Sequence, residues 1–157
     1  MASVNYSGRS VDLFIFQGAI PAGESRISLS FGDNGGEVIT GIQKLVQTFT
    51  IMFLTERGTV KGHDDVGTEF VTAVRQGRIL DEADVKSEFL VASELIQQKL
   101  DLEADANALP EDEQLLSTTL LDYTIDRGAS KLTMKVRITS VAGESREVFL
   151  PVPIAIQ

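Results

Sequence analysis

The sequence predicts an α+β fold in which helices pack on an antiparallel C-terminal β-meander, with an N-terminal β-hairpin arm. Two periodicities predict this class. Apolar residues recur every three to four positions within 40–54 and within 81–100, as in amphipathic helices. They recur at every second position within 131–140, as in a strand with one buried face. The helices are the only segments available to cover the apolar face of the terminal sheet.

The length of 157 residues predicts about one globular domain. We divide the chain into an N-terminal arm, residues 1–36, and an α+β domain, residues 37–157. Within the arm, Val11–Phe16 and Arg26–Phe31 are the expected strands of a β-hairpin, because a turn rich in Pro and Gly separates them.

The first predicted helix runs from about Thr40 to Leu54. Thr40 and Gln43 have the spacing of a capping box, in which two side chains satisfy free backbone N–H groups. The expected apolar face comprises Ile42, Leu45, Val46, Phe49 and Phe53. The expected polar stripe comprises Gln43, Lys44, Gln47 and Thr48.

Two more helices are predicted after a glycine-containing loop at Thr55–Gly67. A short helix covers Thr68–Gln76, and Gly77 is well placed to end it in a left-handed conformation. A longer helix runs from about Asp81 to Leu100 or a little beyond, with Glu82 and Lys86 forming an i,i+4 ion pair. Its expected buried residues are Val85, Phe89, Ala92, Ile96 and Leu100.

Three strands are predicted to complete the chain: Leu115–Asp126, Lys131–Ser140 and Arg146–Ile154. The middle strand has its apolar residues at alternate positions, so one face should be buried. The last strand contains Pro151 and Pro153, which cannot donate backbone hydrogen bonds. We therefore expect the last strand to lie at an edge of the sheet or to leave it.

Charge and composition argue against several classes of partner. The sequence has 14 Lys and Arg against 23 Asp and Glu, a formal net charge of -9. This balance disfavours nucleic acid and anionic membranes as partners, because both attract clustered positive charge. The lack of cysteine excludes disulfides, thiolate metal sites and cysteine nucleophiles. No apolar window approaches the roughly 18 residues of a membrane span, and no motif indicates a cofactor.

Few residues have catalytic or metal-binding potential. We interpret His63, beside Asp64 and Asp65, as a solvated loop residue, because acid–base catalysis needs further groups nearby. We interpret the acidic segment Asp101–Gln114 as a solvated helix end and loop. Five of its positions follow calcium-loop spacing: Asp101, Glu103, Asp105, Asn107 and Asp112. Ala106 stands where that loop requires glycine, so the residues indicate neither a metal site nor an enzyme.

A spacing pattern links the first two predicted helices. The first helix ends in Leu54-Thr55, Gly58 follows three residues later, and Gly67 lies twelve residues after Thr55. This pattern, followed by a short helix, a long acidic helix and a terminal meander, resembles the baseplate wedge or sheath-initiator subunits of contractile phage tails. Relatives of that family occur in type VI secretion baseplates and contractile bacteriocins. The similar region covers about residues 38–154.

The chain departs from the family pattern within the loop. The family has a Glu-x-Arg pair just after the first glycine, which grips neighbouring wedge subunits, whereas this chain has Thr59 and Val60 there. Glu56 and Arg57 stand before the glycine instead. The aromatic residue that the family has before the second glycine is Val66 here.

The resemblance implies a structural baseplate protein of the virion, assembled in the host cytoplasm, with six copies around the tail tube. Its implied partners are wedge proteins and the tail sheath protein, with the tail tube or spike hub as a further contact. The implied wedge-binding residues are Glu56, Arg57, Gly58, Lys61 and Gly67. Sheath strands would add along the last strand, at Arg146, Val148, Leu150 and Val152.

Two other functions stay open. A head–tail connector or tail-terminator subunit is also a small acidic α+β protein, although it would not need the Leu-Thr and glycine pattern. A lysozyme-type hydrolase would need one carboxyl group in an apolar pocket and a second at a fixed distance. Glu56 and Asp64 are the candidates for that pair.

Overall fold

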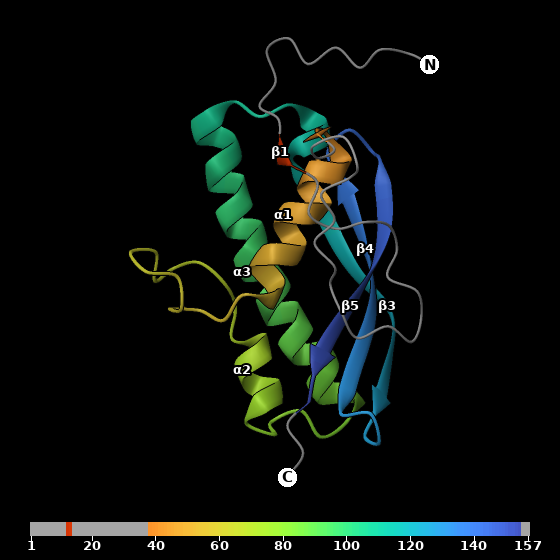
Figure 1. The fold of residues 1–157 in the computed structure, drawn as a ribbon. Helices are drawn as coiled ribbons and strands as arrows, with labels where there is room; N and C mark the ends of the chain where they lie inside the picture. Colours follow the sequence, from red (N-terminus) through yellow and green to blue (C-terminus); the bar gives the residue numbers. More distant parts are fainter. Residues whose placement is uncertain (1–11, 14–37, 155–157) are drawn as a thin grey trace.

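The computed structural model describes residues 12–13 and 38–154. Within this part of the chain, helices lie against a three-stranded antiparallel sheet, so the predicted α+β class is confirmed (Figure 1). A short ribbon pairs β1 (Asp12–Leu13) with β2 (Val38–Ile39) in antiparallel register. The hairpin predicted from Val11–Phe16 and Arg26–Phe31 lies outside the described residues, apart from Asp12 and Leu13.

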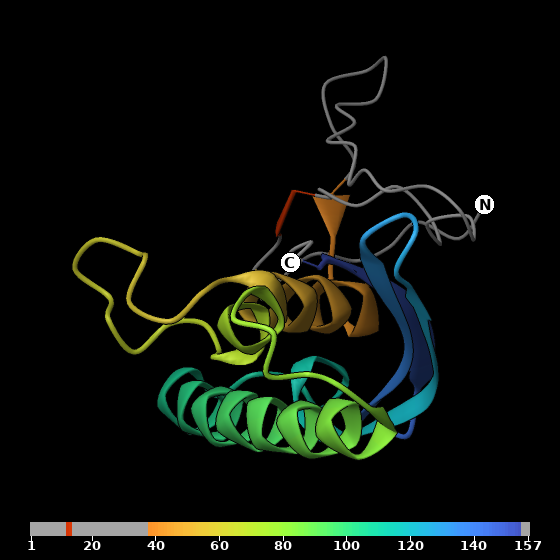
Figure 2. The same ribbon diagram turned by 90° about the horizontal axis from the view of Figure 1, so that it is seen from below.

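The helices are α1 (Ile42–Leu54), α2 (Phe70–Arg75) and α3 (Glu82–Asn107). They lie on one side of the sheet, with α1 and α3 next to each other (Figure 2). A 3-10 turn, η1 (Glu111–Glu113), connects α3 to the first strand of the sheet. The helices thus form one layer and the sheet forms the other.

The sheet contains β3 (Leu115–Asp126), β4 (Lys131–Ser140) and β5 (Ser145–Pro153) in that spatial order. The predicted alternation of β4 is confirmed: its inward side chains, Leu132, Met134, Val136 and Ile138, are at most 1% exposed. Register shifts interrupt the pairing of β3 with β4 at two places, whereas β4 and β5 pair continuously. In the order β3-β4-β5 the terminal strand lies at an edge of the sheet, as its prolines predicted.

Four phenylalanine rings occupy the place where the three helices meet. The ring centroid of Phe53 lies 4.8 Å from that of Phe70, 5.7 Å from Phe89 and 5.8 Å from Phe49. All four side chains are at most 2% exposed. Aromatic rings at such distances add attraction to the large apolar area that they bury, so this cluster joins α1, α2 and α3.

The start of α1 differs from the prediction. Gly41 is the N-cap residue, with φ of 63°, and no side chain caps the helix locally, so the predicted Thr40–Gln43 capping box is wrong. A residue with φ in this range is best supplied by glycine, which has no Cβ to clash with the backbone. Gln47, predicted on the polar stripe, is 1% exposed, and its side-chain amide donates to Asp12 Oδ2 at 3.0 Å.

The ends of the other helices follow local sequence signals. Gly77 has φ of 67°, and the Arg78 N–H donates to the Ala73 carbonyl at 2.9 Å, so the predicted left-handed helix end is confirmed. Asp81 and Asp84 form a capping box at the start of α3, and the predicted Glu82–Lys86 ion pair is present. Helix α3 continues to Asn107, beyond the predicted end near Leu100.

We expect Phe53→Ala to destabilise the fold by about 3–5 kcal/mol, because it removes a buried ring at the junction of three helices. Leu90→Ala is the matched control: Leu90 is 58% exposed, so this change should alter stability by about 0.5 kcal/mol or less. Urea unfolding followed by circular dichroism measures both. Equal free energies of unfolding for Phe53→Ala and the parent chain would contradict the role of the cluster.

Candidate functional site

The segment between α1 and α2 forms a loop that is closed at its base. The Thr68 N–H donates to the Thr55 carbonyl at 2.9 Å, and the Arg57 N–H donates to the Thr68 carbonyl at 3.1 Å. The buried Thr68 hydroxyl also donates to the Phe53 carbonyl at 3.0 Å. Residues 57–67, here called the projecting loop, extend away from the helices and sheet (Figure 2). These bonds fix both of its ends to the core.

Gly67 is required by the close approach of the two chain segments at this base. A Cβ atom at this position would lie 2.5 Å from the Thr55 carbonyl oxygen, and φ is +95°. Gly58 and Gly62 also have positive φ, but a Cβ there would meet nothing within 4 Å. Gly67, the second glycine of the sequence pattern, is therefore needed because a side chain would clash with Thr55. Gly58 is favoured only because its φ is positive.

Ion pairs hold the projecting loop from two sides. Glu56 pairs with Arg75 of α2 at 2.8 Å, and Asp65 pairs with Lys99 of α3 at 2.5 Å. The hydrogen bond from Lys99 lowers the pKa of Asp65 below its usual value of 3.8. Asp65 remains 68% exposed, so we regard this pair as an anchor for the loop and not as a major source of stability.

The five predicted wedge-binding residues all lie in or next to this loop. Glu56 and Gly67 belong to its base, whereas Arg57, Gly58 and Lys61 are exposed. The structure therefore brings together the residues that the sequence pattern grouped. Their role in binding a wedge protein stays a prediction.

Strand β5 has one side that no other described strand pairs with. Next to its two ends, the Ser140 N–H donates to the Glu144 carbonyl and the Ile154 N–H donates to the Ser130 carbonyl, both at 2.8 Å. Because antiparallel pairing alternates and β4–β5 pairing is continuous, the even-numbered residues of β5 bond to β4. The odd-numbered residues direct their backbone groups toward the unpaired side.

The predicted strand-addition residues belong to the even-numbered row. Leu150 and Val152 are 0% exposed and Val148 is partly buried, so these side chains pack against the helices, whereas Arg146 is exposed. The backbone groups that face the unpaired side come from the odd-numbered residues instead: Ser145, Glu147, Phe149, Pro151 and Pro153. The sequence analysis did not identify this row. Pro151 and Pro153 are a signal for it, because proline is tolerated only where the backbone N–H does not bond to a neighbouring strand.

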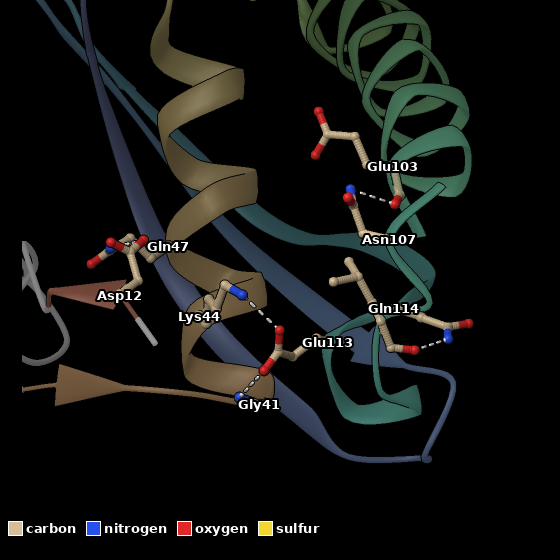
Figure 3. A network of polar contacts seen from close by, with 9 residues as sticks. Asp12, Gly41, Lys44, Gln47, Glu103, Asn107, Glu113 and Gln114 are labelled. Atoms are coloured by element: carbon tan, nitrogen blue, oxygen red, sulfur yellow. Dashed lines mark hydrogen bonds and ion pairs between the residues drawn. The ribbon is translucent and has the colours of Figure 1, made fainter. Parts of the chain in front are cut away.

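A buried carboxylate at the start of α1 was also missed. Glu113 is 5% exposed; its carboxylate accepts the Gly41 N–H at 3.2 Å and pairs with Lys44 Nζ at 2.7 Å (Figure 3). The sequence interpretation placed Glu113 in a solvated acidic segment, which is wrong for this residue. A carboxylate at a helix N-terminus replaces the missing local cap and interacts favourably with the helix dipole. This network has a structural role, because both charges are already paired.

The alternatives that need carboxylate chemistry find little support in the geometry. Glu56 pairs with the cation of Arg75 at 2.8 Å, which differs from the apolar surroundings that a glycosidase acid needs. Four positions of the calcium-loop pattern, from Asp101 to Asn107, lie within helix α3 and point in different directions around it. Within residues 12–13 and 38–154, no three acidic or histidine side chains gather as a metal site would require.

No protein-family profile, curated protein or solved structure matches the chain. Among the described residues, none of the helices combines the length and the apolar character needed to cross a bilayer.

We expect Gly67→Ala to open the base of the projecting loop. Gly62→Ala should cost about 1–2 kcal/mol through left-handed strain alone, whereas Gly67→Ala adds a clash with Thr55 and should cost more. Urea unfolding and the rate of tryptic cleavage at Arg57 and Lys61 measure the two effects. The steric role of Gly67 is refuted if both variants behave alike.

We also expect Lys99→Met to raise the pKa of Asp65 toward 3.8. Because folding lowers this pKa, the contact stabilises the folded loop above the unfolded-state pKa and is lost as pH falls through the folded-state value. An NMR titration of the Asp65 side-chain carboxyl carbon measures the change. Lys86→Met, which removes the Glu82 pair on the same helix, should leave Asp65 unchanged. An unaltered Asp65 titration in Lys99→Met would show that the anchor does not exist in solution.

Proposed function

We propose that the chain is a structural subunit of a contractile-tail baseplate that joins wedge proteins to the sheath. One observation carries this proposal: the residues with the family-like spacing form the closed base of an exposed loop. A loop that is fixed at both ends loses less conformational entropy on binding than a flexible one. This construction suits a protein contact and is independent of any catalytic group.

The projecting loop is the proposed wedge contact. Arg57 and Lys61 are exposed on it, while the chain as a whole has a net charge of -9. Exposed cations on an otherwise acidic protein favour an acidic patch on the partner, because complementary charge selects orientation and raises the association rate. Wedge proteins are the partners that the family resemblance implies for this loop.

The unpaired side of β5 is the proposed sheath contact. Ser145, Glu147 and Phe149 can each offer a backbone N–H and a carbonyl there, whereas Pro151 and Pro153 can offer only carbonyls. A strand that adds to this edge would gain most of its hydrogen bonds in the first half of β5. The prolines thus restrict strand addition to a defined length and register.

The strand-addition proposal predicts that Phe149→Pro abolishes sheath assembly, because it removes an outward N–H and leaves the bonds to β4 intact. Phe149→Ala is the matched control: it removes the same side chain but keeps the N–H, so sheath should still assemble. Electron microscopy of particles carrying each variant gives the readout, with circular dichroism to confirm folding.

Normal sheath on Phe149→Pro particles would refute this use of the β5 edge. If Phe149→Pro and Phe149→Ala both abolish sheath assembly, the contact is made by the Phe149 side chain and not by its backbone N–H. Deletion of the whole strand is a poor test, since Leu150 and Val152 belong to the core.

A further inference from the structure

Helix α3 carries a second apolar row on its exposed side. Its buried row packs against the core and comprises Val85, Phe89, Ala92, Ile96 and Leu100. A different row follows steps of four, three and four residues: its apolar members are Val91, Leu95 and Leu102, and its polar member is Gln98. Val91 is 63% exposed and Leu102 is 72% exposed. Such steps place side chains on one helix face, in the spacing by which helices pack along a seam.

A hollow of about 270 Å³ lies beside this row, at the base of the projecting loop. Its apolar lining includes Phe70, Val91 and Leu95, and its polar lining includes Arg57 and Glu69. The exposed row therefore borders a recess that can accept an apolar side chain. This recess distinguishes the row from an ordinary solvated helix surface, which has no hollow for a partner's side chain.

The charges around the row are mainly negative. Glu69, Glu88 and Glu94 line the hollow beside the cation Arg57, and Asp101 lies one further turn along the same side of α3. Two further cations near the row are paired: Arg78 lies 3.7 Å from Glu88, and Lys99 binds Asp65. Exposed apolar side chains bordered by carboxylates favour a partner that is apolar in the centre and basic at its flanks.

We propose that this face of α3 binds a basic amphipathic helix of a partner protein. Apolar residues of that helix would lie along Val91, Leu95 and Leu102, with one side chain in the hollow. Its Lys or Arg residues would lie beside Glu94 and Asp101, as flanking charges do in paired helices. The surface is separate from the β5 edge, and the proposal does not depend on the proposed baseplate function.

A second copy of the chain is a poorer occupant of the same face. Two α3 helices would bring like charges together along the seam, which is unfavourable. The outer face of the sheet carries Lys135 and Arg137, but both already pair with Glu147 at 2.7 Å. A basic helix from another protein would bring opposite charges to α3, and its cations would not already be paired.

The test uses the full-length chain and three fluorescein-labelled peptides. One is a designed helix with Leu at helical spacing and flanking Lys residues, the second has Glu in place of Lys, and the third is a scrambled form of the first. Fluorescence anisotropy should show saturable binding of the basic helix alone. Val91→Ser with Leu102→Ser should weaken binding at least tenfold.

Glu94→Lys with Asp101→Lys should weaken binding of the basic helix similarly and create binding of the acidic one. Glu103→Lys is the matched control, because Glu103 is an exposed acid of α3 outside the row, and it should have little effect. The proposal fails if no peptide binds, if the scrambled peptide binds equally, or if Glu103→Lys acts like the seam variants. It also fails if sedimentation shows a dimer of the parent chain that Val91→Ser and Leu102→Ser dissociate.

Discussion

Phe53 connects the helical core to the base of the projecting loop. Its ring joins the aromatic cluster between α1, α2 and α3, and its carbonyl accepts the Thr68 hydroxyl at the base of the projecting loop. The same residue therefore couples the packing of the helices to the position of an exposed loop. Because close-packed interiors tolerate little displacement, this hydrogen bond limits movement of the Thr68 end of the loop relative to the core.

The two proposed binding elements belong to one scaffold. The projecting loop leaves the helical layer, while the unpaired side of β5 belongs to the sheet layer, and β5 packs against α1 through buried side chains. The Glu113 carboxylate joins the start of α1 to η1, close to the beginning of β3. This contact spans a long sequence separation and fixes the helical layer relative to the sheet. The proposed wedge contact and the proposed sheath contact are therefore connected through the same packed core.

Much of the fold could be predicted because its signals are local. The alternation within 131–140, the helical spacing within α1 and α3, and the glycine at position 77 all depend on neighbouring residues. The N-cap of α1 could not be predicted, because its carboxylate comes from Glu113, far along the chain. Gln47 was misplaced for a similar reason: its partner is Asp12.

The candidate site was predicted only in part. The loop residues were grouped by their spacing, and the close contact at Gly67 supplies the physical reason for that spacing. The residues of β5 were chosen by their apolar side chains, which the core uses, whereas the backbone row at Glu147 and Phe149 depends on the register with β4. The exposed row of α3 was overlooked because the buried row of the same helix satisfied the expected periodicity. The register between two strands and the exposed face of a helix can be assigned only once the elements are seen packed together.

An affinity pull-down of the tagged chain from its native lysate, with mass spectrometry of the bound proteins, tests our proposal that the chain joins wedge proteins to the sheath. We expect sheath and wedge subunits to be recovered together, and we expect Gly67→Ala to reduce recovery of the wedge subunits more than Gly62→Ala does. Recovery of a neck or capsid protein without sheath or wedge subunits would contradict the claim and identify a connector instead.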